Sequence, residues 1–329
     1  MRRKSGKVSL IIDIAKKIFA APMAGVGDAV FRRMCKEEGA DICVTEMISA
    51  DGLFYLNAKT RKMFLLQAWD RPGGVQIFGA NPDKMADAAR FICDEVEPDF
   101  IDINSGCPVN KVVSKNGGAA LLKNPKLFAQ ITEKVVKASN IPVFVKIRSG
   151  WDSSSFIEKE YGKIAQDSGI SAIALHARTK SMGYSGNAMW ERIKILKDSV
   201  KIPVIANGDI RCGKDAEEVY KQTGCDAIMV GRAAFGNPFV FGEIKRYLSK
   251  ENPKIITLQD KILSIKKHLR YFEEFYGENA TLGEIKKHLA WYIKGYENSS
   301  QIRADIMKCK NIGEAKQILT IFFETLPQK

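Results

Sequence analysis

Several polar side chains stand within otherwise apolar segments of this 329-residue chain, and they are the first candidates for chemistry. A buried polar group costs free energy unless it finds a partner, so polar groups that gather on one face of a fold usually mark a ligand site. These candidates are Gln76, Asn104, Lys146, Arg148, His176, Arg178, Asn207 and Asp209. Their cations and amides suit an anionic ligand that also carries polar ring edges.

One cysteine directly follows such a segment, in the sequence NSGCP. Cys107 stands there between a glycine and a proline, so we expect a rigid turn to present its thiol. A thiol in that place could act as a nucleophile or as a proton donor. The alternative is a small apolar filler, which is the role of most cysteines. Cys212 is also expected on this face, but its neighbours suit phosphate better, so Cys107 is our catalytic candidate.

Glycines in two later segments predict where the anionic end of a ligand binds. Gly208, Gly213 and Gly231 would let backbone N–H groups approach a phosphate, and Arg232 would add a charged fork. Glycines of this kind also serve tight turns, so alone they are weak signals.

Lys146 and Gln76 make the prediction more specific. A lysine can balance the negative charge of a reduced flavin ring, and an amide can bond the pyrimidine edge of that ring. Together with the glycines they fit flavin mononucleotide, FMN. A purely structural role stays open for both residues. Lys146 could form an ion pair inside the barrel, and His176 could be a core histidine whose hydrogen bonds are made within the protein.

Short apolar runs recur along the chain, and each is followed by a stretch of helical period. Near-continuous apolar runs are typical of strands that are buried on both faces of a parallel sheet. The expected strands are 18–25, 41–47, 74–79, 100–106, 142–148, 172–178, 203–209 and 227–232. Eight strand–helix units predict an α/β fold of the (β/α)8 TIM-barrel type, whose active site lies at the carboxyl ends of the strands. A Rossmann fold is disfavoured because no GxGxxG follows the first strand.

The pattern changes after about residue 250, where strand signals end. Amphipathic stretches at 258–275, 282–296 and 315–326 predict a small C-terminal helical bundle domain. We therefore divide the chain into a catalytic barrel, 1–250, and a helical domain, 251–329, joined near Asn252-Pro253.

Charge and composition narrow the class of protein. Lysine and arginine number 51 against 38 acids, a net charge of +13, which favours a polyanionic partner. Seven cysteines without a CxxC pair, and only three histidines, argue against a metal site and for a reducing cytoplasm. No apolar run approaches the roughly 20 residues that would cross a bilayer, and the basic first residues do not look like a secretory signal.

The motifs as a set resemble the tRNA-dihydrouridine synthase family of bacterial type. The most specific is DINSGCPVNKVVSKNGGAALL, and others occur along the barrel and into the tail. The matching stretches include APMAGVGD (21–28), VQIFGANP (75–82), VKIRSGW (145–151), LHARTKSMGYSG (175–186), IANGDI (205–210), VGRAAFGNP (230–238) and KKHLAWYIKG (286–295). A single departure is Gly27, where relatives often have threonine.

The resemblance implies roles for these residues. FMN would be held by Pro22, Met23, Ala24, Gln76, Lys146, His176, Asn207, Gly208, Asp209, Gly231 and Arg232. NADPH, with NADH as the alternative, would reduce the flavin, hydride would pass to C6 of a uracil in tRNA, and Cys107 would protonate C5. The tRNA would contact Asn104, Arg148, Arg178, Lys286 and Lys287. We expect a monomer that uses no metal and does not enter a membrane.

Two other functions use many of the same features. Dihydroorotate dehydrogenases are FMN enzymes on the same barrel, with a cysteine or serine near the flavin, but they need no basic helical tail. An RNA-binding or folding factor that has lost catalysis is the third reading, and intact Cys107 and Lys146 speak against it.

Overall fold

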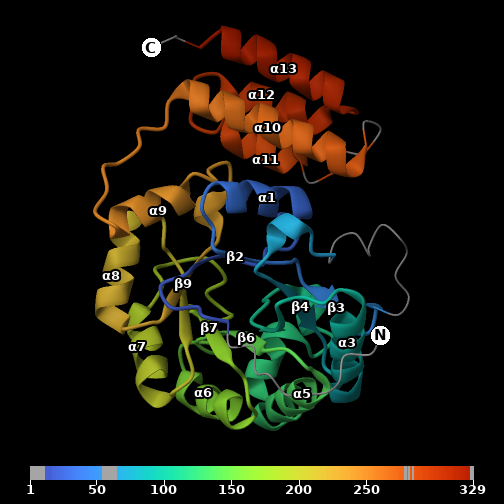
Figure 1. Ribbon diagram of the computed structural model, residues 1–329, viewed down its shortest axis with the longest axis vertical. Helices are drawn as coiled ribbons and strands as arrows, with labels where there is room; N and C mark the ends of the chain where they lie inside the picture. Colours follow the sequence, from blue (N-terminus) through green and yellow to red (C-terminus); the bar gives the residue numbers. More distant parts are fainter. Residues whose placement is uncertain (1–11, 54–64, 278–279, 281, 284, 327–329) are drawn as a thin grey trace.

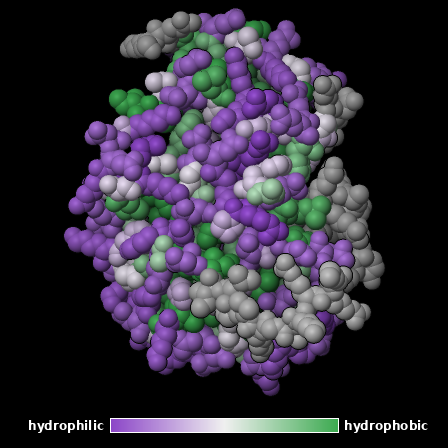
Figure 2. All heavy atoms as spheres, viewed as in Figure 1, coloured by the Kyte–Doolittle hydropathy of each residue, from purple (hydrophilic) through white to green (hydrophobic). Residues whose placement is uncertain are grey.

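The protein is described by a computed structural model, which covers residues 12–53, 65–277, 280, 282–283 and 285–326. The chain forms a barrel, and the C-terminal helices pack against one side of it (Figure 1). Within the described residues, no helix is long and apolar enough to cross a membrane. Hydrophilic side chains dominate the face of the molecule in Figure 2, over the barrel and the tail alike.

Parallel strands close into a barrel, which confirms the predicted fold class. The strands are β1 (Ile18–Ala20), β2 (Ile42–Val44), β4 (Gly73–Phe78), β5 (Phe100–Ser105), β6 (Val143–Arg148), β7 (Ala172–His176), β8 (Val204–Asn207) and β9 (Ala227–Val230). Each of these strands pairs with the next one named, and β1 pairs with β9 to close the barrel. The short strand β3 (Ile48–Ser49) lies between β2 and β4 in the sequence, but β2 and β4 pair directly with each other. Most strands are shorter than predicted, because the last residues of the predicted ranges lie in the loops that follow.

Helices follow the strands and pack around the barrel. Those of the barrel are α1 (Ala29–Glu37), α3 (Pro82–Glu95), α4 (Asn110–Val113), α5 (Pro125–Ala138), α6 (Glu158–Asp167), α7 (Trp190–Ser199), α8 (Gly213–Thr223) and α9 (Val240–Leu248), with short 3-10 turns at Ala68–Asp70, Gly118–Lys123 and Arg232–Ala234. Two of these helices begin at residues whose side chains cap them. The Asp28 carboxylate accepts from the Phe31 amide, and Asn124 caps α5 in front of Pro125.

The inside of the barrel has an apolar floor. Phe100 and Phe144 stack there with their ring centroids 4.3 Å apart, and both side chains are buried. Side chains alternate along a strand, so residues two and four positions further on point to the same side. The residues above Phe144 on β6 are therefore Lys146 and Arg148, and a polar layer covers the apolar floor at the carboxyl end.

The C-terminal helices pack on the barrel through a second apolar core. They are α10 (Leu258–Tyr276), α11 (Ile285–Tyr292), α12 (Ser299–Lys308) and α13 (Ile312–Glu324). Helix α12 was not predicted, because its sequence SSQIRADIMK carries few apolar residues. The core that they form also includes Val30 and Met34 of α1, so the barrel and the tail share apolar surface. The division of the chain at residue 250 stays a prediction.

Candidate active site

A cavity of about 870 Å³ opens at the carboxyl ends of the strands, where the barrel fold predicts a site. It brings together the residues predicted to bind FMN or to donate the proton, and three of the five predicted tRNA contacts, but not Lys286 and Lys287. Cys212 and Gly213, which were also expected on this face, do not line it. Its lining includes Pro22, Met23, Ala24, Gln76, Asn104, Cys107, Lys146, Arg148, His176, Arg178, Asn207, Gly208, Asp209, Gly231 and Arg232. Cys107 is the single cysteine among the described residues that line it. The prediction that these residues share one face is confirmed, whereas their roles stay predictions.

Strand register explains why the polar residues meet. Asn104 of β5 lies opposite Lys146 of β6, and Arg148 lies opposite His176 of β7. His176 in turn lies opposite Asn207 of β8. Because inward-facing positions on neighbouring parallel strands are aligned by these pairings, each polar residue adjoins the next around the ring.

The turn that carries Cys107 is held on several sides. The Asn104 side-chain oxygen accepts from the backbone N–H groups of Gly106 and Cys107, at 3.1 and 2.9 Å. The Cys107 carbonyl accepts from the Ala119 amide at 3.0 Å. Gly118 lies against the same turn with φ +56°, and a Cβ there would come within 2.9 Å of the Cys107 carbonyl oxygen. The thiol is therefore presented by a fixed backbone.

Burial raises the pKa of the Cys107 thiol, and the opposing effects of the Val109 amide and of the Arg148 and Lys146 charges do not cancel the rise. The side chain is half-buried in the cavity wall. A thiol in this environment stays protonated at neutral pH. Cys107 is thus suited to give a proton rather than to attack as a thiolate.

A buried carboxyl group that sequence reasoning missed anchors a chain of side-chain amides. Asp102 accepts from the Gln76 amide nitrogen at 2.5 Å, and the Gln76 oxygen accepts from the Asn104 nitrogen at 2.8 Å. Asn104 then holds the Cys107 turn. An amide has one donor end and one acceptor end, so an acceptor at Asp102 orients both amides in sequence. Asp102 could have been found from its inward position on β5, two residues before Asn104.

Burial raises the pKa of Asp102 to about 7, against the lowering effects of the Gln76 hydrogen bond and the Lys146 charge. In the unfolded chain this carboxyl ionises near 3.8. Between these values the folded state keeps a proton that the unfolded state has lost, so the group's contribution to stability falls as pH rises from about 4 to 7. Asp102→Asn should therefore gain stability relative to wild-type apoprotein across this window. Urea unfolding at several pH values measures the difference.

Asp209→Asn is the matched control, because folding lowers the pKa of Asp209 whereas it raises the pKa of Asp102. Burial raises the pKa of Asp209, but the hydrogen bonds from Arg178 and the Ala188 amide outweigh it and hold the pKa below its usual value. This carboxylate stabilises the fold above its unfolded pKa, so its Asn variant should lose stability at neutral pH and recover toward acid. If the unfolding free energies of Asp102→Asn and wild type change in parallel over pH 4–7, the pKa of Asp102 is not raised in the folded protein.

Lys146 and His176 determine the charge of the cavity. Burial lowers the pKa of Lys146 to about 8, helped by Arg148 and opposed by Asp102 and Cys107. Burial also holds the pKa of His176 well below its usual value, and the charges of Lys146, Arg148, Arg178 and Arg232 act in the same direction. The imidazole is therefore neutral, and at neutral pH Lys146 is a half-buried cation in the cavity wall.

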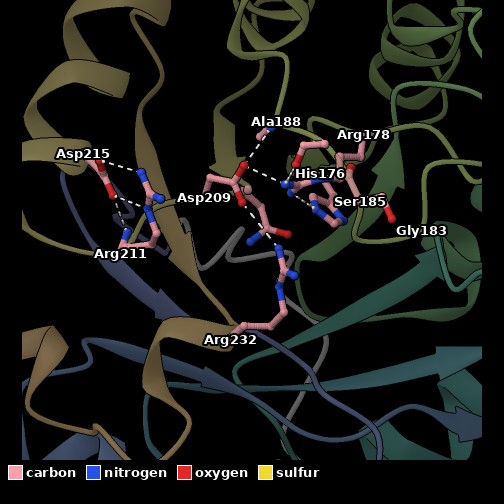
Figure 3. Close-up of polar contacts among 12 residues, drawn as sticks. His176, Arg178, Gly183, Ser185, Ala188, Asp209, Arg211, Asp215 and Arg232 are labelled. Carbon is pink, nitrogen blue, oxygen red and sulfur yellow. Dashed lines mark hydrogen bonds and ion pairs between the residues drawn. The ribbon is translucent and has the colours of Figure 1, made fainter. Parts of the chain in front are cut away.

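The loops after β7 and β8 are tied together by one carboxylate (Figure 3). Asp209, with φ +53°, forms an ion pair with Arg178 at 2.6 Å, accepts from the Ala188 amide at 2.7 Å and faces Arg232 at 3.4 Å. Arg178 also donates to the Ser185 and Gly186 carbonyls. This side of the cavity is built around Asp209, with the Arg232 guanidinium still about half exposed.

The five predicted tRNA contacts lie in different surroundings. Arg148 is buried and donates to the carbonyls of Gly106, Thr179 and Gly183, so it holds loops together. Asn104 and Arg178 are likewise bonded within the wall of the cavity, as described above. Lys286 and Lys287 lie outside the cavity on α11, with their ammonium groups donating to backbone carbonyls. The roles of all five in binding RNA stay predictions.

Two aromatic residues at the cavity were not selected from the sequence. Tyr184 is 58% exposed, and the guanidinium of Arg232 lies 4.7 Å from its ring centroid. Phe235 lines the cavity and stacks on Trp291 of α11. Both stand in loops, where no hydrophobic period shows which way a side chain points. Their only signal was their place in the motifs LHARTKSMGYSG and VGRAAFGNP.

Comparison with known proteins gives a consistent result across the chain. The sequence model of the family described as dihydrouridine synthase (Dus) matches residues 19–326. The chain is 38% identical over 317 residues to tRNA-dihydrouridine synthase B of Xanthomonas axonopodis pv. citri, covering 95% of this chain and 94% of that protein. It is 40% identical over 292 residues to the protein of the same name from Vibrio vulnificus, covering 88% and 90%.

Solved structures resemble the barrel at low sequence identity. The old yellow enzyme homologue from Zymomonas mobilis has a TM-score of 0.52 and 14% identity, and the match covers 77% of this chain and 96% of that chain. A variant of NCR from the same organism gives a TM-score of 0.51 at 17% identity, covering 77% and 95%. These similarities support the fold. Within the part of the chain that is described, no group of three or more His, Cys, Asp or Glu residues could hold a metal ion.

Proposed function

This chain belongs to the dihydrouridine synthase family, and on that premise we propose that it reduces a specific uridine of tRNA to 5,6-dihydrouridine with FMN and NADPH. The observation that carries the proposal is a half-buried thiol, with its pKa raised, on a fixed turn of a cavity that also holds the half-buried cation Lys146. A proton donor and a cation beside one cavity are what a reduction that adds hydride and a proton requires.

The residues present fit FMN. Gly208 has φ +123°, and a Cβ there would lie 2.9 Å from the Ala188 side chain and 3.2 Å from the His176 ring, so only glycine leaves the backbone open to a ligand. Gly231 and the half-exposed Arg232 supply a donor set for a phosphate on the same side. Lys146, neutral His176 and Asn207 would face the polar ring edges. Bound flavin would supply the hydride that the C5–C6 bond of uracil accepts.

The chain's own residues supply the proton and the geometry. Cys107 Sγ would give its proton to C5 of the uracil, and the thiolate that remains would be stabilised by the Arg148 and Lys146 charges. Asn104 and Asp102 keep the turn in place while the thiol reacts. Tyr184, exposed at the mouth between two arginines, would offer an aromatic surface to a nucleotide that enters from a folded RNA.

The partner would be tRNA, in keeping with the net charge of +13 and with the names of the relatives. We propose further that the protein works as a monomer in the cytoplasm, without a metal, and that NADPH is used in preference to NADH. A comparison of the two nucleotides as reductants of the bound flavin would decide the last point.

The purified protein should be yellow and release FMN rather than FAD, because the proposed donor set at Gly231 and Arg232 suits one phosphate and the chain carries no dinucleotide fingerprint. With FMN, NADPH and unmodified tRNA it should form dihydrouridine, which mass spectrometry of the digested tRNA detects. Free uridine and free orotate serve as controls and should be poor substrates. Release of FAD, failure of the apoprotein to take up FMN, or reduction of free uridine or orotate in place of tRNA would each contradict the proposal.

A further inference from the structure

Helix α11 of the tail lies directly against the barrel, next to α1 (Figure 1). Phe31 of α1 packs on the His288 ring of α11, with centroids 4.4 Å apart. From this place α11 reaches two loops of the cavity, the one after β1 and the one after β9. Residues of both loops line the cavity, among them Met23 and Val26 of the first and Arg232 and Phe235 of the second.

The first loop is held by hydrogen bonds to its carbonyl oxygens. His288 is 1% exposed, and its Nε2 lies 3.1 Å from the Val26 oxygen. Because a carbonyl can only accept, Nε2 carries the hydrogen and donates it. Lys287 donates to the neighbouring Gly25 oxygen at 3.2 Å, and Glu46 accepts from the Gly25 amide. Consecutive residues of α11 thus bond consecutive carbonyls of the loop.

The second loop is held by close packing. The Trp291 ring stacks on Phe235 with centroids 4.3 Å apart and planes 14° apart. Gly236 follows with φ +63°, and a Cβ on it would lie 2.4 Å from the Trp291 carbonyl carbon. Backbone therefore meets backbone here, and Phe235 is placed between the helix and the cavity.

We propose that His288 and Trp291 of α11 are positioning residues for the flavin: they fix the loops after β1 and β9 in the conformation that binds it. This inference rests on the proposed function, since it assumes the same cofactor in the same cavity. Neither residue lines the cavity, so each acts through a loop. Preorganised loops bind more tightly because less freedom is lost on binding. By linkage, the flavin should stabilise the docking of α11 to the same extent.

Trp291→Ala tests the inference in the full-length apoprotein, with FMN as the probe. We expect the dissociation constant for FMN, from quenching of flavin fluorescence, to rise about tenfold, the usual order for an aromatic pair. Trp291→Phe keeps a stacking ring and should restore most of the affinity. Phe323→Ala is the control, because Phe323 of α13 is also a half-buried aromatic but packs on the tail core rather than on the barrel. It should leave FMN affinity within about twofold of wild type.

Circular dichroism and thermal unfolding of each apoprotein separate a local effect from loss of the fold. A folded Trp291→Ala protein that binds FMN as wild type does would overturn the inference, and so would a Phe323→Ala protein that binds it equally weakly. Wild type that takes up no FMN would refute the proposed function, and this inference with it.

A measurement on the wild type keeps the inference testable should Trp291→Ala fail to fold. Addition of FMN should slow amide hydrogen exchange in α11 by several-fold and leave exchange in α13 nearly unchanged. If α11 exchanges at the same rate with and without FMN while the flavin binds, α11 does not position the cofactor loops.

Discussion

Cys107→Ala should keep its yellow colour and still be bleached by NADPH at close to the wild-type rate, while its re-oxidation by tRNA slows roughly 10²–10⁴-fold. The thiol's proposed task is one proton, delivered after hydride has reached the uracil, and a positioned general acid is usually worth that factor. Neither binding nor reduction of the flavin needs that proton. Stopped-flow absorbance measures the two half-reactions separately.

The structure makes this variant a clean test. The Cys107 turn is held through its backbone, by Asn104 and by the Ala119 amide, so removal of Sγ should leave the turn in place. Cys212→Ala is the control, because Cys212 stands at the N-cap position of α8 outside the lining of the cavity, and the variant should be re-oxidised by tRNA at close to the wild-type rate. A Cys107→Ala protein that NADPH cannot reduce, or one that tRNA re-oxidises at the normal rate, would show that the residue has another role.

The pKa of the thiol adds a dependence on pH. Since burial raises the pKa of Cys107, the thiol keeps its proton beyond its usual titration range. The rate of re-oxidation by tRNA should therefore hold across neutral pH and fall only as alkaline pH removes the proton.

The barrel could be predicted from sequence because its strands are apolar on both faces and separated by regular helices. The predicted residues converge because strand register aligns Asn104 with Lys146, and Arg148 with His176, once the barrel closes. This alignment does not depend on loop conformation. The gathering of polar side chains at the carboxyl ends of the strands could therefore be predicted from the order of the strands.

Residues whose position depends on loops or on distant packing were not predictable in this way. Trp291 contacts the cavity loop through Phe235, and no local pattern links residues so far apart in the chain. Arg148 and Arg178 were expected to face RNA, yet their guanidinium groups bond loop carbonyls that only the folded chain brings near. Helix α12 was missed because it buries little apolar surface. Its sequence therefore lacks the regularly spaced apolar residues from which a helix is predicted.

Lys146→Met should lower the midpoint potential of the bound flavin by tens of millivolts and slow its reduction by NADPH by roughly 10²-fold. Reduction brings negative charge into the cavity, and Lys146 is a half-buried cation in the cavity wall that could balance it. Methionine has a similar length without the charge. FMN affinity should change less, because the proposed phosphate contacts at Gly231 and Arg232 are untouched. Lys115→Met, at an exposed lysine outside the cavity lining, should change neither quantity.

The pH dependence of flavin reduction tests whether Lys146 is the group that supplies the positive charge. Burial lowers the pKa of Lys146 to about 8, so the cavity loses this cation as pH rises through that value. The negative charge of a reduced flavin would raise the pKa of Lys146 and shift this loss to higher pH. The rate of flavin reduction should therefore fall on the alkaline side in wild type. Lys146→Arg keeps its charge at every accessible pH, so the fall should disappear there even if altered geometry makes the rate lower. An alkaline fall that persists in Lys146→Arg, or an unchanged potential in Lys146→Met, would assign the charge to another group.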